Sequence, residues 1–298
     1  MEVYYLSIVK KIFIYFILFL LGFFGYKGLS LSCNKYFNKQ HENADKKIKE
    51  NLKKDSNKVL SALIYSAVGA FNHKDAIKAF KVEIKKMGII NNWYLEFSND
   101  PSLFNNKSLK NYDVVIWNNS TGNTLDEKQM DSFENYIENG GGYVGIHGAG
   151  DSSKNWKWYY EVLLKARFSH QPNREYQFQN GTLEKKCNSN FSNCEKLPNR
   201  WDREEEWYVF NESPKKKGSS VIYNLIVKDL VMTNIKDGVI RESSMGDDHP
   251  IVWTNCVGKG KAFYSAMGHK GKYFLEPLHL EVIKSGIIWA ANKSAKCN

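Results

Sequence analysis

The 298-residue sequence contains none of the short motifs that would identify a phosphate-binding or zinc-dependent enzyme at once. No HExxH or HxH spacing places two metal ligands on one helix or strand. The segment Gly258-Lys259-Gly260-Lys261 has neither the spacing nor the Ser/Thr of a Walker loop, and no internal repeat is evident. With 42% apolar and 14% aromatic residues, the chain is neither disordered nor fibrous.

One glycine pattern has the spacing of a nucleotide-binding motif but lacks its structural context. The spacing Gly140-x-Gly142-x-x-Gly145 is that of a dinucleotide fingerprint. A true fingerprint follows a strand and opens a helix, whereas this one follows a predicted helix and opens a predicted strand. We therefore predict no nucleotide site here.

The net charge of +10 also gives no support for nucleic-acid binding. Residues 1–58 hold eleven Lys against five acidic residues, which leaves 31 basic against 27 acidic residues beyond them. A nucleic-acid surface would need clustered Lys and Arg on the folded domain, with aromatic residues among them. We predict that nucleic acid is not a partner.

The amino terminus predicts export or membrane attachment. Lys10 and Lys11 precede an unbroken apolar run over residues 12–26. That run sits at the upper limit of a signal-peptide core and below the ~20 residues of a comfortable membrane-spanning helix. Residues 1–32 are therefore expected to be a signal peptide or a membrane anchor, with Cys33 a candidate for lipidation, and residues 33–58 a polar, Lys-rich linker. The predicted location is extracytoplasmic, in the periplasm or at the cell surface.

Five cysteines fit an oxidising compartment once Cys33 is set apart. Cys187 and Cys194 lie in one loop-like segment, and Cys256 and Cys297 remain as a second candidate pair. The alternative for Cys256 is a free buried thiol.

The domain, residues 59–293, shows an α/β pattern. In its first half, short apolar runs predict strands and 3.6-residue apolar spacing predicts helices. The expected strands are 59–67, 93–97, 113–117 and 142–147, and the expected helices are 73–87, stopping at Gly88, and 124–139, opened by Thr124. This alternation predicts a doubly wound, mostly parallel sheet. The second half is expected to hold a helix at 156–165, a β-rich insertion at 174–235, a hairpin of 251–254 with 262–267, and a closing helix at 277–292.

His147 occupies a position with the form of a nucleophile elbow. A buried strand ends there in the small-x-small turn of residues 145–149, which would project His147 over the edge of the sheet. Histidine can serve as acid, base, metal ligand or hydrogen-bond donor, but it cannot replace the Cys of a glutamine amidotransferase. We therefore exclude glutamine amidotransferase chemistry.

Other histidines are expected at the same edge, because ligands of open α/β sheets bind outside the carboxyl ends of the strands. His73 follows the first strand, His269 follows the last, and His249 precedes Pro250 at the start of the adjacent strand. A structural role is the alternative for each of them.

Carboxylates and aromatic residues can complete such a site. Glu206 is expected to face it, whereas Glu204 and Glu205 are expected on a solvated edge strand. The histidines with Glu206 could hold a divalent metal, and no other cofactor is expected. Aromatic rings suited to stacking on a sugar, or alternatively to filling the core, are Trp158, Tyr159 and Trp207.

Several segments together resemble the ThuA-like (trehalose utilisation) family. They are Phe71-Asn72-His73, residues 140–147, Trp158-Tyr159, Glu206-Trp207-Tyr208, His249-Pro250-Ile251-x-Trp253, Gly258-Lys259-Gly260-Lys261-x-Phe263-Tyr264 and Gly268-His269. The resemblance implies a flavodoxin-like, class I glutamine amidotransferase-like fold and a role in carbohydrate metabolism. It also implies site status for His73, His147, Glu206, His249 and His269. Ser169-His170-Gln171-Pro172 departs from the family pattern, which leaves His170 outside the predicted site.

The leading hypothesis is an exported or membrane-anchored enzyme that acts on a small carbohydrate as a hydrolase or lyase. Its expected catalytic residues are His147, His73, Glu206 and His269. Its expected substrate-binding residues are His249, Trp158, Tyr159 and Trp207. The alternative is a carbohydrate- or partner-binding module of the same fold without chemistry.

Overall fold

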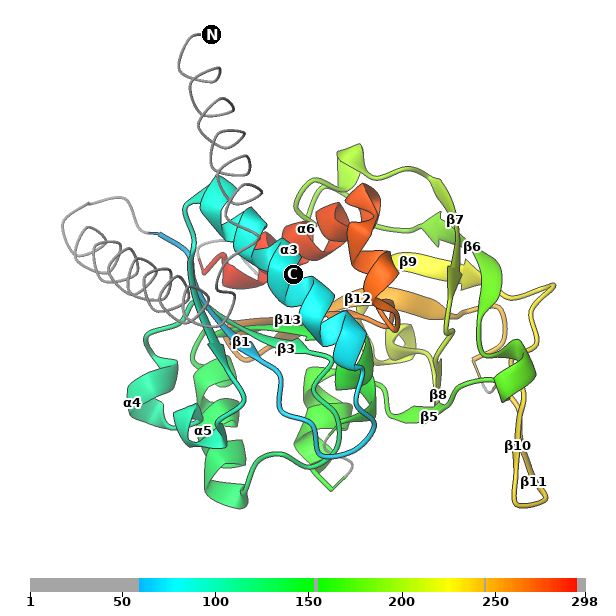
Figure 1. Cartoon of the computed structure of the whole chain (residues 1–298), viewed down its shortest axis with the longest axis horizontal. Helices are drawn as coiled ribbons and strands as arrows, with labels where there is room; N and C mark the ends of the chain where they lie inside the picture. Colours follow the sequence, from blue (N-terminus) through cyan, green and yellow to red (C-terminus); the bar gives the residue numbers. More distant parts are fainter. Residues whose placement is uncertain (1–58, 153–154, 244, 294–298) are drawn as a thin grey trace, which may run out of the picture. The chain divides into compact units, whose positions relative to one another are not determined.

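The computed structural model of the chain describes residues 59–152, 155–243 and 245–293. The predicted leader and linker, residues 1–58, lie outside the described residues. A nine-stranded sheet with the order β2-β1-β3-β4-β13-β12-β9-β6-β7 forms the centre of the domain (Figure 1). The predicted α/β fold with a mostly parallel central sheet is confirmed.

Five strands run parallel at one side of the sheet. They are β1 (Ser61–Tyr65), β2 (Tyr94–Ser98), β3 (Val114–Asn118), β4 (Gly142–Ile146) and β13 (Gly260–Ser265). Every residue of β3 and β4 is buried, as expected for strands covered on both faces. Helices α3 (Lys74–Asn91) and α6 (Pro277–Ala291) cover one face, and α4 (Asn106–Leu109) and α5 (Glu127–Glu138) cover the other (Figure 1).

Two predicted helix boundaries are wrong, each for a local reason. Helix α3 continues past Gly88 to Asn91. Gly88 lies against Leu95 of β2, where a Cβ would come within 2.6 Å of a Leu95 methyl carbon, so this glycine serves packing and does not end the helix. Asn92, in the left-handed conformation, ends the helix instead. Helix α5 is capped by Asp126 rather than Thr124, since the Asp126 side chain forms a capping box with Gln129.

The other side of the sheet is antiparallel. Its strands are β12 (Pro250–Val257), β9 (Ser220–Ile226), β6 (Gln179–Lys185) and β7 (Arg200–Glu205). The segment predicted as a β-rich insertion therefore continues the central sheet. Four reversals separate β13 from β7, so β7 points the same way as β13 and β4 and ends at the same edge.

Two small sheets accompany the large one. Strand β5 (Phe168–His170) pairs with β8 (Val209–Phe210), and β10 (Asn234–Lys236) pairs with β11 (Val239–Arg241) in a hairpin (Figure 1). The predicted helix at 156–165 contains a π-helical turn over Tyr159–Leu163.

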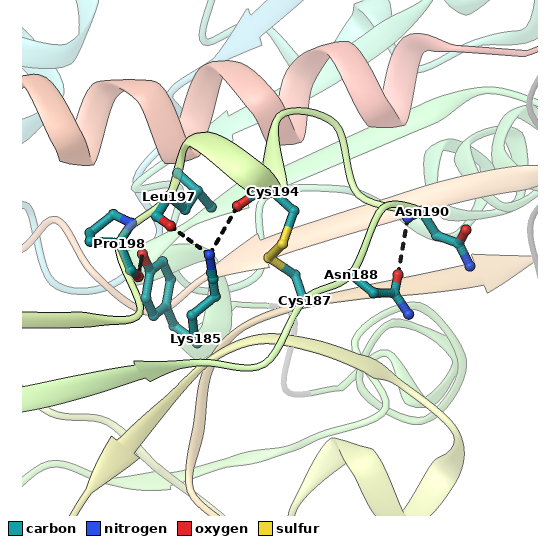
Figure 2. Close-up of a disulfide and its surroundings, with 8 residues drawn as sticks. Lys185, Cys187, Asn188, Asn190, Cys194, Leu197 and Pro198 are labelled. Carbon is teal, nitrogen blue, oxygen red and sulfur yellow. Dashed lines mark hydrogen bonds between the residues drawn. A yellow bond between two sulfur atoms is a disulfide. The ribbon is translucent and has the colours of Figure 1, made fainter.

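A disulfide joins Cys187 to Cys194 within the loop between β6 and β7 (Figure 2). Lys185 supports this loop by donating hydrogen bonds to the carbonyls of Cys194 (3.3 Å) and Leu197 (2.7 Å). Cys256 is disulfide-bonded as well, whereas Cys297 of the second predicted pair lies outside the described residues. Within the described ranges, no helix is long and apolar enough to cross a membrane.

Candidate functional site

His147 stands at the sharp turn predicted from the sequence. It follows β4 directly, has a φ of 42° and begins the 3₁₀ turn His147–Asp151. Positive φ is uncommon for a residue with a side chain and is typical of strained functional turns. Gly148 fits here because a Cβ would lie 2.8 Å from a methyl carbon of Thr121 and 3.1 Å from Nδ1 of His73.

The His147 ring is fixed from two sides. Its Nδ1 lies 2.7 Å from the carbonyl oxygen of Ala266, so in the neutral ring Nδ1 carries the proton and Nε2 carries the lone pair. The ring also packs against Tyr208 at 4.3 Å between centroids, and the Tyr208 residue is itself buried. His147 is completely buried, so its Nε2 can only interact with the protein or with a group bound inside it.

His73 approaches His147 from the loop that follows β1, at the amino-terminal cap position of α3. Its ring meets the rings of His147 and His269 edge-on, with centroids 4.8 and 4.7 Å apart. Burial, reinforced by the neighbouring His147 and His269, lowers the pKa of His73 to about 2. Its buried Nδ1 has no hydrogen-bond partner among the described residues, which is costly for a polar atom unless something binds there.

Glu206 and His269 complete the group. Glu206 follows β7, and its Oε2 lies 2.8 Å from Nδ1 of His269 and 3.2 Å from Nε2 of His147. Burial alone would raise the pKa of Glu206, but the bonds to the two histidines outweigh burial and hold it below its usual range. Conversely, burial opposes a charge on His147, and the contact with Glu206 overcomes it and raises the pKa of His147.

These four side chains form a set of donors that could hold a metal ion. One donor atom each from His73, His147, Glu206 and His269 lies within 4.8 Å of all the others. We call these residues the His/Glu cluster. Imidazole nitrogens with one carboxylate are a common ligand set for divalent transition metals.

The hydrogen bonds require a proton or a metal ion between His147 and Glu206. With the Nδ1 proton directed at Ala266, the Nε2 lone pair of neutral His147 faces the carboxylate oxygen of Glu206 at 3.2 Å. Two acceptors at that distance repel each other unless a proton or a metal ion lies between them. A backbone carbonyl on the far nitrogen is also the usual outer partner of a metal-binding histidine.

The remaining predicted site residues lie in other surroundings. Tyr159 is fully buried and stacks on Trp117, and Trp158 stacks on Trp156, which corresponds to the core role left open from the sequence. Trp207 is fully buried as well and donates from Nε1 to the carbonyl of Gln179. Side chains without exposed surface offer no face for a sugar, so the geometry does not support stacking by Tyr159 or Trp207.

The histidines outside the His/Glu cluster bond to the backbone. His249 is buried and its Nε2 lies 2.9 Å from the carbonyl of Tyr208, while His170 makes the same kind of contact with Met232. Burial lowers the pKa of His249 to about 4. The hydrogen bond to the Tyr208 carbonyl acts in the opposite direction, and the neighbouring His170 lowers the pKa further. Neither of them is in the donor set found among the described residues.

Sequence reasoning missed three residues around the His/Glu cluster. Gln177 donates from Nε2 to Oε1 of Glu206 at 2.6 Å. The ring of Phe71, which is 61% exposed, lies 5.9 Å from that of His269, and the ring of Phe178 lies 5.1 Å from it. Phe71 lies in a segment already matched to the ThuA-like family, but Gln177 and Phe178 stand in the predicted insertion without any pattern that marks them.

The prediction of a solvated Glu205 is wrong. Its side chain is fully buried and receives hydrogen bonds from the loop after β13 and from Arg203. Glu204 is about one-third exposed, and it binds Lys270, Lys272 and Tyr273.

The fold and the His/Glu cluster define an α/β protein of the flavodoxin-like, glutamine amidotransferase-like class in which histidine occupies the elbow. The chain belongs to the ThuA (trehalose utilisation) family, which matches residues 61–290. It is similar to a ThuA-like protein from Bacteroides uniformis, with 26% identity, a TM-score of 0.63, and coverage of 79% of this chain and 94% of that one. A ThuA-like protein from Parabacteroides merdae has the same fold, with 16% identity, a TM-score of 0.59, and coverage of 81% and 93%. No curated protein matches the chain.

Proposed function

We propose that the protein is a metal-dependent enzyme that acts on a carbohydrate, as a hydrolase or a lyase. The observation that carries the proposal is the convergence of one ligand atom from each of His73, His147, His269 and Glu206 within 4.8 Å of one another. Membership of the trehalose utilisation family supports a sugar as the substrate.

The ligands of the ion would be His73, His147, His269 and Glu206. A divalent cation held there would polarise a carbonyl or hydroxyl oxygen and lower the pKa of a bound water. The chain supplies the orientation: the Ala266 carbonyl fixes the His147 ring, and Gln177 holds the second oxygen of Glu206. These outer contacts keep the ligand atoms aimed at one point.

Without a metal, the same contacts would allow His147 and His269 to transfer protons, with Glu206 orienting them. The ligand set favours the metal-dependent form, because three imidazoles and one carboxylate that converge on one point are a common set for divalent transition metals.

The sugar would approach past His269. The His269 side chain is 13% exposed, whereas those of His147 and Glu206 are 0% and 2% exposed. Phe71 and Phe178 both place their rings against His269 and are the aromatic residues available for stacking on a sugar ring. His249 would not touch the sugar; its proposed role is to hold the backbone of Tyr208, whose ring packs against His147.

An extracytoplasmic location is part of the proposal. The apolar run at residues 12–26 favours export or membrane attachment. The Cys187–Cys194 disulfide agrees with an oxidising compartment. Fractionation of cells that express the full chain tests this part, and recovery only in the cytoplasm would contradict it.

The full chain, loaded in turn with Mn²⁺, Co²⁺ and Zn²⁺, should be incubated with a panel of mono- and disaccharides and their 3-keto forms, with product analysis by mass spectrometry. We expect turnover of at least one sugar, which disappears with a chelator and in His147→Asn. Lys186→Gln, on the exposed Lys186–Glu184 pair, is the matched control and should keep full activity. A sugar that binds unchanged would instead establish the non-catalytic binding module, and no binding at all would contradict a carbohydrate substrate.

A further inference from the structure

The carboxylate of Glu205 connects two ligand-bearing segments that are distant in sequence. Its Oε2 accepts from the backbone N–H of Gly268 (2.8 Å) and its Oε1 from those of His269 (3.3 Å) and Glu206 (3.0 Å). Glu206 and His269 are the pair of the His/Glu cluster joined by the 2.8 Å contact. A single side chain thus binds the backbone of both.

Only a carboxylate suits this position. The fourth contact, to Nη2 of Arg203 at 2.9 Å, also comes from a donor, so both oxygens of Glu205 face donors only. A carboxylate accepts at both oxygens, whereas an amide has one oxygen and one NH₂ group. In either orientation, a glutamine would direct its NH₂ group at two donors and lose their hydrogen bonds.

Glu205 is itself held in place by Arg203. Arg203 also pairs with Glu276 at 3.2 Å, just before α6, and its guanidinium lies over the rings of Trp201 and Tyr273. Both carboxylates therefore bind Arg203, but only Glu205 has contacts with the backbone of ligand residues. A comparison of the two carboxylates can therefore distinguish an effect of losing a negative charge beside Arg203 from an effect of losing the hydrogen bonds to the ligand residues.

The contact also crosses the sheet. Three strands, β12, β9 and β6, separate β13 from β7, yet Glu205 at the end of β7 binds Gly268 beyond the end of β13. The Glu205 side chain therefore joins the end of β7 to the loop that follows β13.

We propose that Glu205 is the positioning residue of the metal site: its carboxylate sets the separation between Glu206 and His269. This inference rests on the proposed metal-dependent function. Glu205 would not contact metal or substrate. Its loss should change metal affinity and coordination, because removing an outer-shell partner commonly costs about 10- to 100-fold in metal affinity.

The test compares Glu205→Gln with Glu276→Gln in the full chain, by calorimetric titration with Co²⁺ and by the Co²⁺ absorption spectrum. Each variant removes one carboxylate from Arg203. We expect Glu205→Gln to bind Co²⁺ about 10- to 100-fold more weakly with an altered spectrum, and Glu276→Gln to keep the wild-type spectrum and lose clearly less affinity. Equal losses in both variants would overturn the inference, because the effect would then be one of charge.

Two results separate this inference from the proposed function. If the wild-type chain does not bind Co²⁺, the metal site itself fails, and the inference fails with it. If wild type and Glu205→Gln bind equally well, the metal site stands and only the inference is overturned.

If Glu205→Gln does not fold, a measurement on the wild-type chain takes its place. Amide hydrogen exchange of a wild-type peptide that covers Gly268 and His269 should be slow, although these residues follow the end of β13. Exchange at the rate of an open loop would overturn the inference.

Discussion

The two sides of the central sheet supply the His/Glu cluster by different means: His73, His147 and His269 follow strands of the parallel side, and only Glu206 follows a strand of the antiparallel side. On the parallel side, His147 follows β4 directly, and His73 and His269 lie in the loops after β1 and β13, so the carboxyl ends of parallel strands bring all three to one edge. On the other side, Glu206 follows β7 at the far edge of the sheet, and its neighbour Glu205 accepts a hydrogen bond from the loop after β13. Strand order therefore brings the three histidines together, whereas Glu206 comes from the far edge of the sheet and is joined to them by buried contacts.

The largest expected effect comes from removing one ligand from each side. His147→Asn and Glu206→Gln should each reduce Co²⁺ affinity by more than the about 10- to 100-fold typical of an outer-shell partner, and both should abolish turnover. Titration calorimetry measures the affinity. Loss in only one of the two variants would contradict a site shared by both sides of the sheet.

The second prediction concerns pH and the buried His249 beside the antiparallel side. Its pKa lies near 4 in the folded protein, below the ordinary value of 6.5. The unfolded chain therefore takes up this proton first as the pH falls. The free energy of unfolding should decrease between pH 6.5 and 4, by about 3 kcal/mol from this group, and the contribution should level off below pH 4.

Denaturant unfolding of wild type and His249→Gln across this pH range tests that prediction. Glutamine keeps a donor for the Tyr208 carbonyl but does not titrate. The free energy of unfolding of the variant should fall less steeply than that of wild type between pH 6.5 and 4. Parallel pH profiles for the two proteins would show that His249 does not couple stability to pH.

The third prediction separates stability from the site within the antiparallel side. The Cys187–Cys194 disulfide lies in the loop that precedes β7, at the edge opposite Glu206. Replacing both cysteines with serine should lower the free energy of unfolding by about 2 to 3 kcal/mol. Co²⁺ affinity should stay at the wild-type value. A parallel loss of affinity would mean that the β6–β7 loop also positions Glu206.

The smallest expected effect is on substrate binding. Phe71→Ala should raise KM about 2- to 10-fold, since an aromatic stacking contact is worth about 0.5 to 1.5 kcal/mol, and should leave kcat and metal affinity nearly unchanged. Phe97→Ala, on β2 at the outer edge of the sheet, is a control for loss of a phenyl ring. Unchanged KM in Phe71→Ala would exclude stacking by this ring.

The parallel side could be predicted well from the sequence because its signals are local. Buried strands appear there as continuous apolar runs, and the small residues around His147 specify the elbow. Convergence of His73, His147, His269 and Glu206 followed from the rule that ligands gather at the carboxyl ends of strands.

The rest depends on contacts that no local pattern encodes. Glu205 and Glu204 are adjacent acidic residues in the sequence, and the contact that distinguishes the buried Glu205 is with the backbone of Gly268, 63 residues away. Tyr159 and Trp207 were candidates for contact with a sugar, but both are fully buried. An aromatic residue near a site can fill the core or bind a ligand, and tertiary packing decides between the two.

Metal content is the most direct test of whether the His/Glu cluster binds a metal ion. The full chain, purified with a histidine-free tag, should be titrated with Co²⁺ and analysed for bound metal after gel filtration. We expect one Co²⁺ per chain, with d–d absorption bands that disappear in both His147→Asn and Glu206→Gln. No bound metal, or binding that survives both substitutions, would contradict it.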